Sequence, residues 1–145
     1  MYRHILLATD GSELANRAVT HALELARSLG AKLTAVTVTD MFPTGPYSPI
    51  PWPADVERYE AAVAASARSI LKKVSEAARP LGVDCATQHI AGRPPAEGIL
   101  AACEEHGCDL IVMASHGRRG IQKLLLGSQA NKVVTQSSVP VLVCR

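Results

Sequence analysis

The sequence predicts an α/β fold built on a mostly parallel sheet. Short apolar segments rich in Val, Ile and Leu alternate along the chain with segments whose apolar residues recur at helical spacing. This alternation predicts the order βαβαβαβαβ, in which right-handed crossovers place helices on both faces of the sheet. Because 48% of the residues are hydrophobic but only 3% are aromatic, the core must consist mainly of aliphatic side chains. The length of 145 residues predicts one domain over residues 1–145.

The first three elements are expected in the N-terminal third of the chain. A strand at His4–Thr9 is apolar and ends at the turn sequence Asp10-Gly-Ser12. From Leu14 to Leu29 the apolar residues recur at helical spacing, and Gly30 ends this helix because glycine readily adopts the left-handed conformation. A second strand is expected at Lys32–Thr39.

A proline-rich segment, Met41–Pro53, separates the second strand from the second helix. It contains five prolines and three of the five aromatic residues, so it can form neither a helix nor a central strand and is predicted to be an extended loop. Two interpretations stay open, a stiff surface connection and a lid or partner-binding arm. The second helix is expected at Ala54–Arg79, closed by Pro80 and Gly82.

The remaining elements complete the alternation. A third strand at Val83–Ile90 is more polar than the others and is therefore expected at an edge of the sheet. A third helix begins at Pro94, since proline is tolerated in the first turn. A fourth strand at Asp109–Met113, a short helix at Gly127–Gln136 and a final strand at Val139–Cys144 follow.

Composition and charge exclude several classes of protein. A net charge of +2 without a dense run of Lys and Arg argues against nucleic-acid binding. No apolar segment is long enough to cross a membrane or act as a signal peptide, so a cytoplasmic location is expected. The cysteines form no CxxC pair and are interpreted as reduced thiols in or near the core. They are Cys85, Cys103, Cys108 and Cys144.

Ligands of open parallel sheets bind beyond the carboxyl ends of the strands, so the residues that follow each strand are candidate site residues. Asp10, directly after the first strand, could accept hydrogen bonds from a ribose, orient a water on a metal ion, or cap the following helix. The segment between the fourth strand and the last helix gives a stronger signal. Gly117 and Gly127 allow close approach of the backbone, and Ser115 and Ser128 offer hydroxyl groups.

The same segment leads into a helix N-terminus, where free N–H groups and the helix dipole favour an anion. Together with nearby cations such as Arg118, this pattern predicts a phosphate-binding loop. His116 could donate to a phosphate or accept a phosphoryl group. No catalytic residue is predicted, however, because no carboxylate lies near His116 in the sequence and the Lys-Ser/Thr end of a P-loop is missing.

Other polar and apolar clusters receive structural interpretations. The remaining histidines show no spacing that suggests a site and are expected to be structural. The segment Leu124–Leu126 is interpreted as core packing. No group of His and Cys has the spacing of a zinc site, so no structural metal is expected.

Four motifs together resemble the universal stress protein family. They are Thr9-Asp-Gly-Ser12, Ser115-His-Gly117, Leu124-Leu-Leu-Gly-Ser128 and Val139-Pro-Val-Leu-Val143. The resemblance covers the whole chain and includes the order of the elements. It implies a Rossmann-like sheet in the order 3-2-1-4-5, similar to that of the adenine nucleotide alpha hydrolases, and bound ATP in one subclass.

The nucleotide signature of that subclass is glycine, two residues, glycine, nine residues, then glycine and Ser or Thr. Gly117, Gly127 and Ser128 match this spacing, whereas Ala114 stands in place of the first glycine. The methyl group of Ala114 is a small intrusion near the implied nucleotide, and alanine resists a positive φ. Nucleotide binding is therefore expected, and the effect of Ala114 on its affinity stays open.

Transferred to this sequence, the resemblance implies that Asp10 holds the ribose or assists a metal and that Val38 meets the adenine through its backbone. Ala8 and Met113 would line the base pocket, and the N–H of Gln129 would help to hold the phosphates. The implied nucleotide-binding residues are Ala8, Thr9, Asp10, Val38, Met113, Ala114, Gly117, Gly127, Ser128 and Gln129. Ser115, His116 and Arg118 are candidate phosphate contacts, and Mg²⁺ or Mn²⁺ would bind to the phosphate oxygens.

The resemblance thus implies an ATP-binding, cytoplasmic regulatory or stress-response protein, at most with slow ATP hydrolysis or self-phosphorylation. The final strand, Val139–Cys144, is apolar on both faces and lies at an edge in the implied order, where an uncovered strand tends to pair. The resemblance implies that it pairs across a two-fold axis to form a homodimer. Two alternatives stay open, an interaction dimer without nucleotide, suggested by Ala114, and a nucleotide hydrolase or nucleotidyl transferase.

Overall fold

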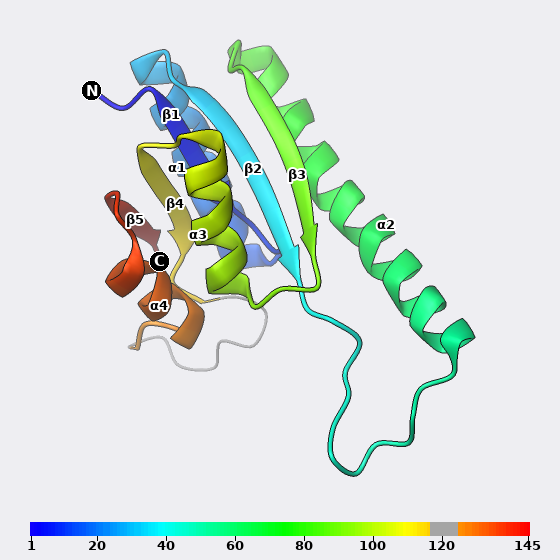
Figure 1. Cartoon of the computed structure of the whole chain (residues 1–145). Helices are drawn as coiled ribbons and strands as arrows, with labels where there is room; N and C mark the ends of the chain where they lie inside the picture. Colours follow the sequence, from blue (N-terminus) through cyan, green and yellow to red (C-terminus); the bar gives the residue numbers. More distant parts are fainter. Residues whose placement is uncertain (117–124) are drawn as a thin grey trace.

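The computed structural model describes residues 1–116 and 125–145, which form a parallel sheet with helices on both faces (Figure 1). The strands are β1 (His4–Ala8), β2 (Lys32–Thr39), β3 (Cys85–Ala91), β4 (Leu110–Ala114) and β5 (Val141–Cys144). The helices are α1 (Glu13–Leu29), α2 (Pro53–Ala78), α3 (Pro95–His106) and α4 (Ser128–Gln136), and a 3-10 turn, η1 (Arg79–Leu81), follows α2. The strand order β3-β2-β1-β4-β5 confirms the predicted order, with β3 at one edge.

Two predicted strands begin later than expected because local hydrogen bonds compete with the sheet. The N–H of Val83 donates to the carbonyl of Ala78, the last residue of α2, at 3.2 Å. This N–H is therefore bonded to the helix and not to the sheet, and β3 begins at Cys85. The N–H of Val139 bonds to the hydroxyl of Ser137 at 3.1 Å, and β5 begins at Val141. The other predicted bounds agree with the structure to within one residue.

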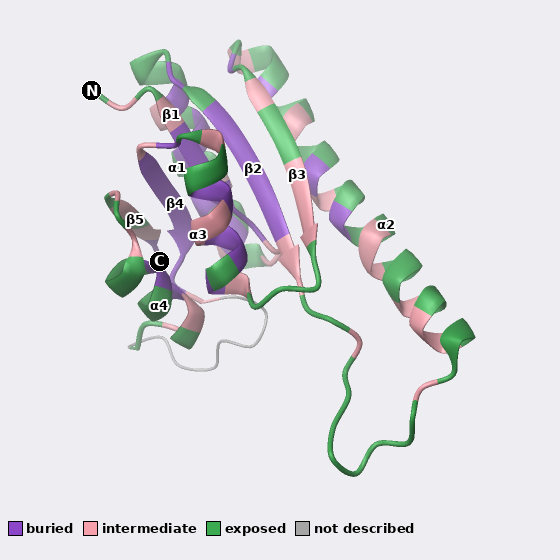
Figure 2. Cartoon of the chain, in the orientation of Figure 1, coloured by how far each residue is buried: buried purple, intermediate pink, exposed green. Residues whose placement is uncertain are grey.

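The core consists of two layers, one on each face of the sheet (Figure 2). Because side chains alternate along a strand, Ile5 and Leu7 of β1 pack against α1 and α2, whereas Leu6 packs against α3 and α4. Alanines dominate the sheet-facing side of α1, which lets this helix approach the strands closely. The strands that end at the site are therefore buried between two helical layers.

The cysteines lie where the sequence predicts. Cys103, Cys108 and Cys144 are buried, Cys85 is half-buried, and all four are free thiols. Burial raises the pKa of each thiol, and for Cys108, which also lies near Cys103 and Asp109, it raises the pKa to about 12. A high thiol pKa disfavours the reactive thiolate, in agreement with a structural role.

The proline-rich segment is an extended loop that runs away from the sheet, as predicted (Figure 1). The N–H of Ser48 bonds to the carbonyl of Gly45 at 3.0 Å, and this turn presents Tyr47, which is 98% exposed. Near the start of the loop, the ring of Phe42 contacts the edge of Tyr59 in α2, with ring centroids 5.2 Å apart. The choice between a surface connection and a lid or arm stays open.

The prediction that Leu124–Leu126 pack in the core is wrong for the two leucines that the structure describes. Leu125 is 64% exposed and Leu126 is 40% exposed, whereas Leu124 lies outside the described residues. Both leucines precede α4 in a segment that forms neither helix nor strand, so no regular element directs them into a core layer. Within residues 1–116 and 125–145, no helix is long and apolar enough to cross a membrane.

Candidate functional site

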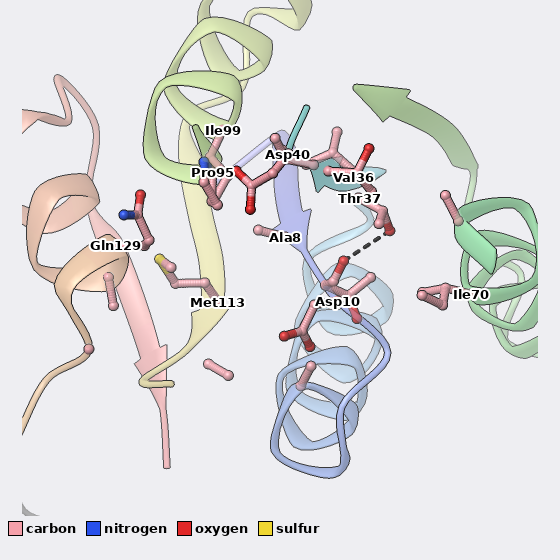
Figure 3. A pocket seen from close by; sticks show the side chains of 18 of the residues that line it. Ala8, Asp10, Val36, Thr37, Asp40, Ile70, Pro95, Ile99, Met113 and Gln129 are labelled. Atoms are coloured by element: carbon pink, nitrogen blue, oxygen red, sulfur yellow. Dashed lines mark hydrogen bonds between the residues drawn. The ribbon is translucent and has the colours of Figure 1, made fainter. Parts of the chain in front are cut away.

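A cavity of about 890 Å³ lies beyond the carboxyl ends of β1, β2 and β4. The strand order reverses between β1 and β4, because the chain proceeds from β1 toward β3 on one side and toward β5 on the other. Such a switch point is the usual ligand site of an open parallel sheet. Figure 3 shows Asp10 in the middle of this cavity, with Met113 and Gln129 on one side and Ile70 on the other.

The structure brings most of the predicted site residues together around this cavity. Those that line it are Ala8, Thr9, Asp10, Val38, Met113, Ala114, Ser115, His116, Gly127, Ser128 and Gln129. Two others, Gly117 and Arg118, lie outside the described residues. The residues come from β1, β2, β4 and α4, so their convergence is a product of the tertiary fold and not of proximity in the sequence.

Asp10 lies in the tight turn between β1 and α1. Its Oδ1 accepts a hydrogen bond from the N–H of Ser12 at 2.9 Å, and Ser12 in turn caps α1 by accepting from the N–H of Ala15 at 3.2 Å. The capping role considered for Asp10 therefore belongs to Ser12. Gly11 has a φ of 75°, a conformation that glycine adopts without strain. The turn thus fixes the Asp10 carboxylate at the wall of the cavity.

The two ends of the segment between β4 and α4 are joined at the cavity. The N–H of Gly127 donates to the carbonyl of Ser115 at 2.9 Å, and the N–H of Ser115 donates to the carbonyl of Cys144 at 2.8 Å. A Cβ at position 127 would lie 2.9 Å from the Ser115 carbonyl oxygen and 3.2 Å from Nδ1 of His116. Glycine is therefore required at position 127 by the packing of the protein itself.

The N-terminus of α4 opens toward the cavity at Ser128 and Gln129. Gly127 occupies the N-cap position, and within the described residues no side chain caps this helix. The first N–H groups of an α-helix have no partner inside the helix, so those of α4 can bind an anion, and the helix dipole favours negative charge there. Phosphate binding at this helix terminus stays a prediction.

The side chain of Gln129 has a role that the sequence did not reveal. Its Oε1 accepts a hydrogen bond from the N–H of Ala96 at 3.0 Å and so caps α3 from a different helix. The signal for this capping role in the sequence was only indirect. The segment Pro94-Pro95 opens α3 with no residue that could cap it, which left a backbone donor to be satisfied from elsewhere.

His116 contains an unsatisfied polar atom. Its Nε2 is buried and has no hydrogen-bond partner within residues 1–116 and 125–145. Because a buried polar atom without a partner costs about 1–3 kcal/mol, a ligand that supplied one would gain binding energy here. His116 also lines the cavity, so a bound molecule would lie beside this residue.

Ala114, which replaces the first glycine of the nucleotide signature, fits its position without strain. It is 7% exposed and belongs to the core layer between the sheet and helices α1 and α2. No described residue other than glycine has a positive φ, so the backbone at Ala114 does not require glycine. The core thus accommodates the methyl group, while Ala114 still forms part of the cavity wall.

One wall of the cavity was not predicted as part of a site. It comes from α2 and consists of Tyr59, Val63, Ser66, Ala67 and Ile70. These residues recur at helical spacing along one face, a pattern that usually indicates core packing. The sequence therefore carried the signal, but periodicity alone does not distinguish a helix face that covers the core from one that continues past the sheet and lines a cavity.

Comparisons with known proteins agree with this fold. A model of the universal stress protein family matches residues 1–145. A universal stress protein of Thermus aquaticus is 35% identical over 145 residues, which cover both chains completely. A solved structure from the same family in Burkholderia pseudomallei aligns with a TM-score of 0.76 at 28% identity, covering 98% of this chain and 95% of that one. A universal stress protein in complex with cAMP aligns with a TM-score of 0.72 at 30% identity, covering 99% and 97% of the two chains.

Proposed function

The chain belongs to the universal stress protein family, and we propose that its cavity binds an adenine nucleotide, with ATP as the expected ligand. The convergence of Asp10 with the N-terminus of α4 at the switch point of the sheet carries this proposal. A carboxylate that can accept from ribose hydroxyls lies across the cavity from N–H groups that can hold phosphates. The relative solved in complex with cAMP supports the proposal, since that ligand contains adenine, ribose and phosphate.

The adenine would bind on the side of the cavity formed by Ala8, Val38 and Met113. The backbone of Val38 offers one N–H and one carbonyl beyond the region where β2 pairs with β1, and the side chains of Ala8 and Met113 provide an apolar surface. Gly98 of α3 contributes indirectly, because a Cβ there would lie 2.7 Å from Cγ1 of Val38. Glycine at this position allows α3 to approach β2 and support the base-binding wall.

The phosphates would bind at Gly127, Ser128 and the N–H of Gln129, with Ser115 and His116 nearby. Nε2 of His116, which has no hydrogen-bond partner among residues 1–116 and 125–145, supports this arrangement, because a phosphate oxygen or a water bound to it would satisfy the buried nitrogen. Gly117 and Arg118 belong to the same proposed phosphate site, although they lie outside the described residues.

A divalent cation, Mg²⁺ or Mn²⁺, would bind mainly to phosphate oxygens. In the described part of the chain no group of three or more His, Cys, Asp or Glu side chains could hold a metal ion by itself. Asp10, which lines the cavity, could assist such an ion, directly or through water. The cation would neutralise phosphate charge, and the chain itself would contribute orientation and not a metal cage.

We further propose that the protein is a cytoplasmic regulatory protein that forms a homodimer through its C-terminal strand. In the described structure β5 pairs with β4 on one side only, and Leu142 is 40% exposed. An edge strand with free N–H and carbonyl groups and apolar side chains tends to pair with another strand. A second copy of β5 across a two-fold axis would pair with the backbone groups of this edge and cover its apolar side chains.

The proposed nucleotide site is tested by extraction and by ligand-dependent melting. Purified protein is denatured and the supernatant analysed for adenine nucleotides, and nucleotide-free protein is then heated with ATP, AMP, cAMP or GMP. We expect released adenine nucleotide or a higher melting temperature with adenine nucleotides, and a smaller shift for Asp10→Ala. Glu60→Ala, which removes a carboxylate from the exposed surface of α2, serves as the control. If no nucleotide is released and none raises the melting temperature, the interaction dimer without nucleotide becomes the better account.

A further inference from the structure

The cavity continues beyond the proposed nucleotide site into a region beside α2. We call this region the α2 lobe and define it by Thr37, Thr39, Tyr59, Val63, Ser66, Ala67 and Ile70. Side chains alternate along β2, so Thr37 and Thr39 lie on the same face as Ala35, which packs against α1 and α2. Val38 lies on the opposite face with Val36 and α3. The α2 lobe and the proposed adenine wall are therefore on different faces of the sheet.

Both ends of the α2 lobe are defined by close contacts. At one end α2 packs so tightly on the turn after β1 that a Cβ at Gly11 would lie 2.7 Å from Cγ1 of Ile70. Figure 3 shows Ile70 on the α2 side of the cavity, across from Met113 and Gln129. At the other end Tyr59 contacts Phe42 at the start of the proline-rich loop. The lobe thus extends along α2 from the Asp10 turn toward this loop.

The polar groups on the sheet side of the lobe are already used within the protein. The hydroxyl of Thr37 donates to the carbonyl of Thr9 at 2.9 Å, and the hydroxyl of Thr39 shares a hydrogen bond of 2.8 Å with Nε2 of His89. These threonines therefore present mainly their methyl groups. From α2 come the apolar side chains Val63, Ala67 and Ile70, and none of the residues that define the lobe carries a charge.

Such walls suit an apolar ligand and not a phosphate. A phosphate group requires cations or free N–H and O–H donors, and burying a charge without such partners is costly. The only uncommitted hydroxyl groups we assign to the lobe belong to Ser66, which is exposed, and to Tyr59 near the loop. A ligand could therefore carry one polar end toward solvent while its body remains uncharged.

We propose that the α2 lobe binds a small, uncharged, apolar molecule beside the nucleotide site. The whole cavity, at about 890 Å³, is near the upper end of the range of about 300–1,000 Å³ that is typical of small-molecule sites. Asp10 lies between the lobe and the proposed phosphate site, so an occupant of either region can influence the other through the turn after β1. The inference goes beyond nucleotide binding and does not depend on it.

The test uses N-phenyl-1-naphthylamine, an uncharged apolar dye whose fluorescence rises in apolar sites. Trp52, the only tryptophan of the chain, lies just before α2 and seven residues before Tyr59, which corresponds to about 10 Å along a helix, so energy transfer from Trp52 reports dye bound in the lobe. The dye is titrated into the protein alone and into protein with a saturating concentration of AMP.

Two variants fill the lobe, and a third controls for added apolar surface. Ser66→Phe and Val63→Phe should weaken dye binding by about tenfold or more, because an inserted ring occupies the space of the ligand. Ala65→Phe adds the same ring at an exposed neighbour that does not line the cavity and should leave binding unchanged. Circular dichroism establishes that each variant is folded. Ile50→Ala, in the proline-rich loop, tests whether the dye binds to that loop instead.

The expected result is saturable dye binding that persists with AMP and is lost in both lobe-filling variants. Equal affinity of the wild type, Ser66→Phe and Val63→Phe would overturn the proposal. Loss of binding in Ile50→Ala without loss in the lobe-filling variants would also overturn it, because the dye would then bind to the loop. Complete displacement of the dye by AMP would overturn it in a different way, since the lobe would then be part of the base site.

Discussion

The backbone N–H of Gly127 donates to the carbonyl oxygen of Ser115 at 2.9 Å, and this bond joins the end of β4 to the beginning of α4. Ser115 is itself tied to β5 through the carbonyl of Cys144. The N-terminus of α4 is therefore held in place relative to the sheet, which also carries the turn that contains Asp10. This relationship explains how a surface segment can hold the proposed phosphate-binding groups close to a strand end.

Substitution of Gly127 should destabilise the protein even without ligand. A Cβ at this position would lie 2.9 Å from the Ser115 oxygen, which is a backbone atom and cannot rotate away. We expect Gly127→Ala to lower the free energy of unfolding by about 1–3 kcal/mol, as is typical of overpacking, measured by urea denaturation. In the control Gly45→Ala the new Cβ would make only an ordinary contact of 3.5 Å with Ser48, and stability should change little. Equal stability of Gly127→Ala and wild type would contradict the packing account.

The hydrogen bond from Ala96 to Gln129 should contribute to stability as a helix cap. Gln129→Ala removes the acceptor for the N–H of Ala96, and we expect a loss of about 1 kcal/mol in the free energy of unfolding. Gln129→Glu keeps an oxygen acceptor and places a negative charge near the N-terminus of α3, so it should retain most of the stability. Gln136→Ala, at the exposed end of α4, is the control for losing a glutamine side chain. A Gln129→Ala variant as stable as this control would exclude the capping role.

Thiol reactivity should follow burial. In native protein near pH 8 we expect Cys85, the half-buried cysteine, to react first with a disulfide reagent such as DTNB, and slowly. Cys108 should be protected because it is buried and its pKa is raised to about 12, so that little thiolate exists. All four thiols should react rapidly in guanidinium. Peptide mapping after partial modification identifies the sites, and early labelling of Cys108 in the native protein would show that the thiol is accessible.

Asp109 should stabilise the protein in a pH-dependent way. Partial desolvation works to raise its pKa, but hydrogen bonds from the N–H groups of Arg3 and His4, at 2.8 and 3.1 Å, outweigh this and hold the pKa below its usual value. A lowered pKa in the folded state contributes stability that is fully present above the unfolded pKa of about 3.9 and disappears as the pH falls through the folded pKa.

Asp109→Asn should therefore be less stable than wild type near pH 7, by about 1 kcal/mol after allowance for solvent exposure. The difference should shrink as the pH falls below about 4. Denaturation curves over a pH series measure it, and Glu60→Gln on the exposed surface of α2 controls for the loss of one negative charge. A difference that is constant down to pH 2 would mean that ionisation of Asp109 is not its source.

Much of the fold follows from local pattern. The apolar run around Leu6, the helical spacing before Gly30 and the prolines of the loop each act within a few residues, so the sequence predicts these elements well. The sequence also indicated most of the residues that line the cavity beyond the strand ends, because strand ends and the start of α4 are marked by glycine, serine and aspartate. The resemblance to the universal stress protein family, carried by those same residues, supplied the strand order.

What the sequence did not reveal depends on contacts between distant segments. The bond between Gln129 and Ala96 requires α3 and α4 to be neighbours, and no pattern in either helix indicates it. The α2 wall of the cavity has the spacing of a core helix, and its role depends on how far α2 continues past the sheet. Leu125 and Leu126 were predicted to be core residues from their spacing before Gly127, although no regular element holds them against the sheet.

Calorimetric titration of nucleotide-free protein with ATP in the presence of Mg²⁺ tests the central claim most directly. We predict saturable binding of one nucleotide per chain, about tenfold or more weaker in Asp10→Ala and unchanged in the surface variant Glu60→Ala. AMP should bind with fewer phosphate contacts, and GMP should bind less well than AMP if the wall around Val38 recognises adenine. The absence of saturable heat with ATP, AMP and cAMP at millimolar concentrations, in protein shown to be folded and free of nucleotide, would contradict the account.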